Sequence, residues 1–164
     1  MQTNVKKYII LLLLAIILYS CDKKDAVNVP NEPMIELISM QPNTINVLDS
    51  TSLIKLVFYF EDGDGDLGRD ATEEQMQIFV KDSRDTSAAF FTYSYPFPYI
   101  PESQRPKGAL HGTVTLNFGR EYFPPQDSLH IALGKDTLYF EVYIVDEAEN
   151  KSNTIVTDSI FVEM

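Results

Sequence analysis

Residues 52–61 read SLIKLVFYFE, and they carry the clearest sign of the fold because apolar side chains recur at every second position. Ile54, Leu56, Phe58 and Phe60 share one face, the pattern of a β-strand that packs against a core. The same period of two recurs along the chain, and no segment keeps a helical period. Short strands joined by polar and proline-rich turns predict an all-β protein, a single antiparallel β-sandwich. We expect about seven strands, near residues 34–40, 52–61, 75–82, 88–95, 111–119, 136–146 and 154–163.

The composition excludes several classes of protein. The chain has 164 residues, which allows one domain with a core. With 24 acidic and 13 basic side chains the net charge is −11, so we expect no nucleic-acid partner, because phosphate binding needs a basic surface. A single cysteine excludes a disulfide framework. The two histidines, His111 and His130, stand in no catalytic motif, so we expect no enzyme.

Residues 1–20 are typical of a bacterial signal peptide. Lys6 and Lys7 precede an apolar run at residues 8–18, which is shorter than the roughly 20 residues that span a bilayer. The sequence LYSC that ends at Cys21 resembles a lipobox, which implies cleavage before Cys21 and lipidation of its thiol. A lipidated cysteine is a durable membrane anchor. The alternatives are a transmembrane anchor or an ordinary secretory signal.

The mature chain then divides into a tether and one domain. Residues 21–33 hold the lipidated cysteine and a polar, proline-containing tether, and residues 34–164 form the sandwich. Asp22 would favour the inner membrane under the enterobacterial sorting rule. The charged run DKKD instead partly resembles a surface-export signal of Bacteroidota. We therefore favour the outer membrane of the cell envelope, with the surface and periplasmic faces both open.

The C-terminal part carries a family resemblance. Residues 136–153 resemble the last two strands and joining loop of bacterial Ig-like and fibronectin type III-like modules. Those loops follow the pattern D-x-A-G-N-x-S, matched here by Asp146, Ala148, Asn150 and Ser152, with Glu149 in the place of glycine. The resemblance implies that the sandwich is Ig-like.

An acidic loop is the strongest sign of a binding site. Residues 61–74 read EDGDGDLGRDATEE, and seven of these fourteen side chains are carboxylates. Aspartates at every second place, with glycines between them, let a tight loop aim several oxygens at one point. Ca²⁺ binds six to eight oxygens in flexible geometry, whereas Mg²⁺ tends to keep its waters. The segment DGDGDLG after an aromatic strand also resembles one that recurs in Bacteroidota lipoproteins with Ig-like domains.

An EF-hand does not fit this loop, because Leu67 stands where glycine is needed and the flanks are predicted strands. In an Ig-like sandwich the loop at 62–74 and the loop at 146–150 lie at the same end. The first strand starts at that end too, so the acidic end should face the tether. We predict a structural Ca²⁺ site, and the alternative is a solvated acidic loop. The best candidate ligands are Asp62, Asp64, Asp66 and Asp146, followed by Asp70, Glu73 and Asn150.

A second candidate site is aromatic. Residues 90–99 read FFTYSYPFPY, and a long proline-rich link follows. A row of such rings can stack on sugars or receive a peptide. The structural alternative is a strand whose aromatic face closes the sandwich, followed by a rigid crossover. The residues of this row are Phe91, Tyr93, Tyr95, Phe97 and Tyr99.

Together these features predict a membrane-anchored, non-catalytic envelope lipoprotein that serves as an interaction or structural module and is stabilised by Ca²⁺. The alternative function is a carbohydrate- or peptide-binding accessory lipoprotein that uses the aromatic row. Its partner would be an envelope protein or a glycan, and the oligomeric state stays open.

Overall fold

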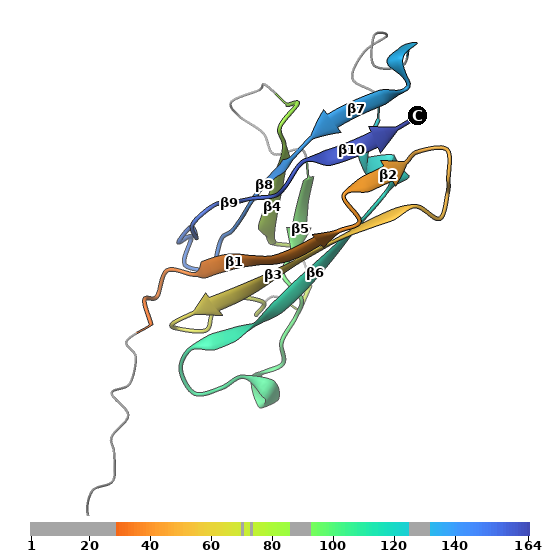
Figure 1. Cartoon of the computed structure of the whole chain (residues 1–164). Coiled ribbons are helices and arrows are strands. Elements are labelled where there is room, and N and C mark those ends of the chain that lie inside the picture. The colour runs from red at the N-terminus through yellow and green to blue at the C-terminus, as the bar shows by residue number, and fades with distance from the viewer. Residues whose placement is uncertain (1–28, 70, 73, 86–92, 125–131) are drawn as a thin grey trace, which may run out of the picture.

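The computed structural model of the protein describes residues 29–69, 71–72, 74–85, 93–124 and 132–164. In these residues it is an all-β sandwich, as Figure 1 shows, and it has ten strands. Two three-residue 3₁₀ helices, η1 (Glu102–Gln104) and η2 (Arg120–Tyr122), interrupt the connections. The described part of the chain has no helix that is long and apolar enough to cross a membrane. The predicted signal peptide, Cys21 and most of the tether lie outside the described residues.

One layer of the sandwich is a three-stranded antiparallel sheet. Its central strand is β3 (Leu53–Asp62), which lies between β1 (Met34–Gln41) and β6 (Leu110–Gly119). As predicted, β3 buries every second side chain from Ile54 onward. This alternation fixes its register, because a slip of one residue would turn the apolar face to solvent.

The second layer is a four-stranded antiparallel sheet with the order β5-β4-β8-β9. These strands are β4 (Met76–Asp82), β5 (Tyr93–Pro96), β8 (Phe140–Ile144) and β9 (Ile155–Val156). Phe118 from β6 and Phe140 from β8 meet between the layers, with ring centroids 4.8 Å apart. The core is thus an aromatic-rich interface between the two sheets.

A third small sheet has the order β2-β10-β7, and it explains why ten strands are present where about seven were predicted. Its strands are β2 (Thr44–Asn46), β7 (Lys135–Leu138) and β10 (Ile160–Glu163), with β10 parallel to β2. The predicted strand at 136–146 is interrupted at Tyr139, whose backbone N–H donates to Ser83 Oγ at 3.0 Å. Its halves, β7 and β8, join different sheets. The predicted strand at 154–163 divides in the same way into β9 and β10, and β2 was not predicted.

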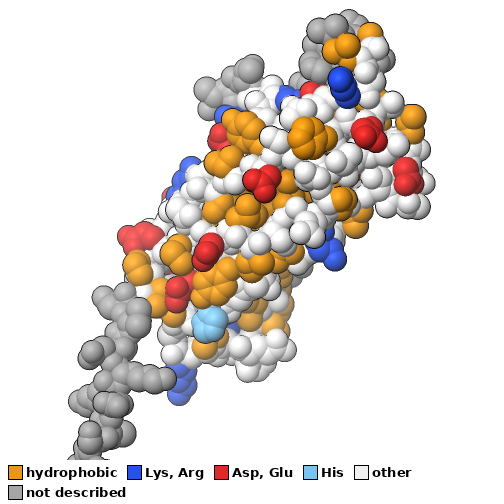
Figure 2. Space-filling model, in the orientation of Figure 1, with side chains coloured by type: hydrophobic (Ala, Val, Ile, Leu, Met, Phe, Trp, Pro, Cys, Tyr) orange, Lys and Arg blue, Asp and Glu red, His pale blue; other side chains and the backbone are white. Residues whose placement is uncertain are grey.

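The end of the sandwich where the chain enters also carries the acidic loops. Met34 at the start of β1 is paired with Glu61 near the end of β3. The backbone N–H of Val145, just after β8, donates to Gln77 O at 2.8 Å, which ties the end of β8 to the start of β4. Figure 2 shows acidic side chains on the surface next to this point of entry. We call the two loops at this end, residues 62–69 and 146–150, the acidic pole.

Candidate metal centre

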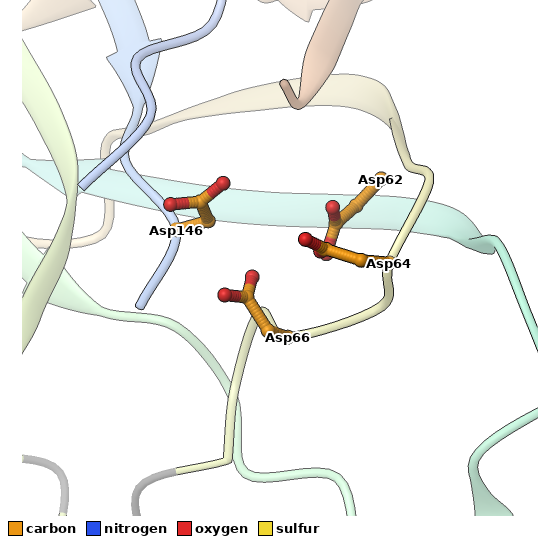
Figure 3. A group of neighbouring side chains, drawn as sticks. All are labelled: Asp62, Asp64, Asp66 and Asp146. Carbon is orange, nitrogen blue, oxygen red and sulfur yellow. The ribbon is translucent and has the colours of Figure 1, made fainter. Parts of the chain in front are cut away.

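Four aspartates converge at the acidic pole. Asp62 is the last residue of β3, Asp64 and Asp66 follow in the next loop, and Asp146 lies two residues after β8. One carboxylate oxygen from each lies within 4.8 Å of the others, and Figure 3 shows the four side chains pointing toward a common centre. The predicted meeting of the two acidic loops is therefore confirmed, and this cluster could hold a metal ion.

The loop after β3 owes its path to glycines and to one buried leucine. Gly65 and Gly68 both have φ near +65°, a conformation that side chains with a Cβ disfavour. Leu67 lies between these turns and is fully buried in the core. Leu67 stands where an EF-hand has glycine, and here it anchors the loop so that the alternating aspartates face inward.

Backbone and side-chain donors hold the carboxylates in place. The backbone N–H of Leu67 donates to Asp62 Oδ2 at 3.1 Å, and that of Ala148 donates to Asp66 Oδ2 at 3.1 Å. Asn150 donates twice to Asp146, from its backbone N–H to Oδ1 at 2.7 Å and from Nδ2 to Oδ2 at 2.8 Å. These hydrogen bonds restrict the orientation of the Asp62, Asp66 and Asp146 carboxylates.

Two carboxylate oxygens in the cluster have no hydrogen-bond partner among the residues that the structure describes. Asp62 Oδ1 and Asp66 Oδ1 are both buried, and the residues that carry them are 0% and 7% exposed. A buried oxygen without a donor is expensive, and such groups are rare in native proteins. A cation at the centre of the cluster would give these oxygens a positively charged partner in place of a hydrogen-bond donor.

The electrostatics of the cluster agree with this interpretation. Burial, together with the nearby carboxylates of Asp66 and Asp64, raises the pKa of Asp62 to about 6, against the opposing hydrogen bond from Leu67. Burial also raises the pKa of Asp66, together with repulsion from Asp146 and Asp64. Both shifts show that ionised side chains are disfavoured here unless a positive charge joins them.

The structure separates the predicted ligands into three groups. Asp62, Asp64, Asp66 and Asp146 form the cluster, with Asp64 on its exposed side. Asn150 uses its side-chain N–H to orient Asp146. Asp70 and Glu73 lie outside the described residues.

A supporting segment was not predicted from the sequence. In the long link after β5, Arg105 Nη1 donates to Gly65 O at 2.8 Å, and the backbone N–H of Ile100 donates to Gly68 O at 2.9 Å. A Cβ on Gly68 would lie 2.4 Å from Pro98 O, so the link packs directly on the acidic loop. The local sequence does not predict these contacts, because they join residues far apart in the chain.

The aromatic row faces largely into the protein. Phe97 is 2% exposed and packs edge-on against Phe60 at 4.9 Å. The Tyr93 hydroxyl donates to Tyr122 O at 2.7 Å, and the Tyr95 ring lies 6.4 Å from that of Phe118. Tyr99 is 44% exposed, and Phe91 lies outside the described residues. The described part of the row closes the sandwich, as the structural alternative predicts.

The donor set of the cluster consists of oxygen alone, which suits hard cations such as Ca²⁺, Mg²⁺ and Mn²⁺. No family model, curated protein or solved structure matches the chain. The fold and the cluster together define an all-β sandwich with a cluster of four aspartates that could hold a metal ion.

Proposed function

We propose that the protein is a non-catalytic lipoprotein of the bacterial cell envelope, an interaction or structural module whose sandwich is stabilised by Ca²⁺. The observation that carries the metal part is the pair of buried carboxylate oxygens without donors, on Asp62 and Asp66. Both residues belong to a cluster of four carboxylates that repel one another until a cation joins them.

The size of the cluster is compatible with Ca²⁺, which accepts the wider ligand separation. Ca²⁺ binds oxygens at about 2.3–2.6 Å, so two of its ligands can lie up to about 5 Å apart. Mg²⁺ binds at about 2.0–2.1 Å, which limits that separation to about 4.2 Å. A spread of up to 4.8 Å therefore suits Ca²⁺ without movement of the loops. Exposed Asp64 leaves one side of the site open to water, which can complete the coordination of Ca²⁺.

The role of the cation is structural in this proposal. Asp62 belongs to the β1-β3-β6 sheet, whereas Asp146 follows β8 in the other layer. A cation bound to both joins the two layers at the end where the chain enters. Without it, the repulsion between these carboxylates would push the same two loops apart.

The envelope part of the proposal rests on the N-terminal sequence. The lipobox-like LYSC predicts a lipid anchor at Cys21, and the chain enters the fold beside the acidic pole. The acidic pole would then face the anchor, with the outer membrane favoured. The alternative of carbohydrate or peptide binding has less support, because Tyr93, Tyr95 and Phe97 pack against the core.

Thermal unfolding of residues 21–164 with Cys21→Ser tests the metal part. Excess chelator is compared with about 10 mM Ca²⁺, and Mg²⁺ is the control. Extracellular sites bind Ca²⁺ with Kd of about 10⁻⁴–10⁻³ M, so Ca²⁺ should add about 1.4–2.7 kcal/mol. That corresponds to a rise in Tm of roughly 3–10 °C. An equal response to both cations, or to neither, would contradict the proposal.

Acyl labelling in cells tests the anchor. The wild-type chain should incorporate labelled palmitate and sediment with membranes, and Cys21→Ser should do neither. A Cys21→Ser protein that stays in the membrane fraction would indicate a transmembrane anchor. If the wild type and Cys21→Ser are both released from the membrane fraction, the N-terminus would be an ordinary secretory signal.

A further inference from the structure

The chain that leads into β1 touches the acidic loop between two of its aspartates. Gly63 separates Asp62 from Asp64, and a Cβ on Gly63 would lie 2.2 Å from Pro30 O and 2.5 Å from Val29 O. Real Cβ atoms do not approach other atoms so closely, so only glycine lets the two backbones meet. We call residues 29–33 the N-terminal arm. The arm therefore lies against the backbone that positions two members of the cluster.

The segment that follows the second acidic loop contacts the chain just after the arm. Asn153 makes two hydrogen bonds to Ile35, accepting from its backbone N–H at 2.8 Å and donating from Nδ2 to its carbonyl at 2.8 Å. Asn153 is fixed to the end of β8, two residues before Asp146, because Ser152 Oγ donates to Asn153 O and accepts from Ile144 N–H. Gly63 in one acidic loop and Asn153, just after the other, thus both contact the incoming chain.

We propose that Ca²⁺ binding is thermodynamically coupled to docking of the N-terminal arm at the acidic pole, an inference that rests on the proposed metal site. In the metal-free protein the four carboxylates repel one another and drive the two acidic loops apart. This separation would weaken the contacts that Gly63 and Asn153 make with the incoming chain. A bound cation brings these loops together and completes the surface on which the arm lies. Coupling of this kind is reciprocal, so a docked arm must also raise the affinity for Ca²⁺.

The consequence for a lipid-anchored protein is control of its reach. With the arm released, residues 22–33 can span at most roughly 40 Å. With the arm docked, only residues 22–28 remain between the anchor and the domain, and they span roughly 25 Å at most. Ca²⁺ would thus draw the domain toward the membrane and fix the direction in which the chain leaves it.

Spin labelling tests this coupling in the chain of residues 21–164. Cys21→Ser removes the native thiol, and Asn31→Cys, at an exposed position of the arm, carries a nitroxide. We expect a broad, immobilised spectrum in about 10 mM Ca²⁺ and a sharp, mobile one in chelator, with Mg²⁺ like chelator. Calorimetry on the same protein measures Ca²⁺ affinity. An identical spectrum in both conditions, with Ca²⁺ binding intact, would overturn the coupling and leave the metal site standing. Absence of Ca²⁺ binding would overturn both.

Two variants test whether a docked arm raises the affinity for Ca²⁺. Gly63→Ala forces the arm away from the acidic loop, and Asn153→Ala removes both hydrogen bonds to Ile35 without altering the cluster. Each should keep the label mobile in Ca²⁺ and weaken Ca²⁺ binding by about fivefold or more. Circular dichroism confirms that each variant folds. Unchanged affinity in a folded Asn153→Ala whose arm is mobile would contradict the proposal, whatever Gly63→Ala shows.

Discussion

Replacing Asp62 with asparagine should have opposite effects with and without Ca²⁺. Asparagine keeps an oxygen that can accept from the Leu67 N–H, and it removes the charge that burial and the neighbouring carboxylates disfavour. Its new amide N–H group would replace an oxygen in a cluster where a buried Asp66 oxygen lacks a donor. In chelator, the variant should therefore be more stable than the wild type. In Ca²⁺, it should gain nothing, because the cluster has lost a charged ligand.

The magnitude follows from the shift in the pKa of Asp62, from 3.8 to about 6. At neutral pH the ionised side chain then costs the metal-free fold up to about 3 kcal/mol. We expect Asp62→Asn to recover about 1–3 kcal/mol in chelator. The recovery can be smaller than the full cost because the buried amide also loses its hydrogen bonds to water. The wild type should gain about 1.4–2.7 kcal/mol from about 10 mM Ca²⁺, so the two proteins should converge there.

Urea unfolding at about pH 7.5 measures both effects on residues 21–164 with Cys21→Ser. Asp158→Asn is the matched control, because it makes the same chemical change at an exposed position outside the cluster. The control should follow the wild type within about 0.5 kcal/mol in both conditions. A loss of stability for Asp62→Asn in chelator would refute the repulsion argument. A Ca²⁺-dependent gain of wild-type size in Asp62→Asn would refute the assignment of the site.

Further predictions concern pH and two positions outside the cluster. Between about pH 4 and about pH 6 the metal-free folded protein keeps a proton on Asp62 that the unfolded chain has lost. Its urea midpoint should therefore fall as pH rises through this range. Above about pH 6, Ca²⁺ should raise the midpoint again. Arg84→Met should lower the free energy of unfolding by about 3–5 kcal/mol without changing Ca²⁺ affinity by calorimetry, because Arg84 bridges buried Asp82 and Asp136. Glu149→Gly should raise the free energy of unfolding by about 0.5–1 kcal/mol in urea, because Glu149 adopts φ +67°, a conformation that costs glycine less than a residue with a Cβ.

The strands that alternate cleanly were predictable from the sequence, and those that depend on distant partners were not. The period of β3 is visible in its own ten residues, because every second side chain meets the core. The interruption at Tyr139 depends on hydrogen bonds with Ser83, more than fifty residues away, and no local pattern signals it. The parallel pairing of β2 with β10 is equally non-local.

The candidate site shows the same division. Asp62, Asp64 and Asp66 stand out by their spacing, and Asp146 followed from the placement of two loops at one end of a sandwich. The orienting role of Asn150 and the support from Arg105 required the structure, since each depends on where one side chain points. Glu149 lies between these cases. Its place in the turn pattern was visible, but its left-handed backbone was not.

Direct titration of Ca²⁺ into metal-free protein by calorimetry tests the central claim most directly. Residues 21–164 with Cys21→Ser should bind one Ca²⁺ with a Kd of about 10⁻⁴–10⁻³ M, and Mg²⁺ at the same concentrations should give no saturable heat. Asp66→Asn should abolish the Ca²⁺ signal, because it removes the charge of a buried member of the cluster, one of whose oxygens lacks a donor. No saturable Ca²⁺ binding up to about 10 mM, or binding that survives Asp66→Asn unchanged, would contradict the account.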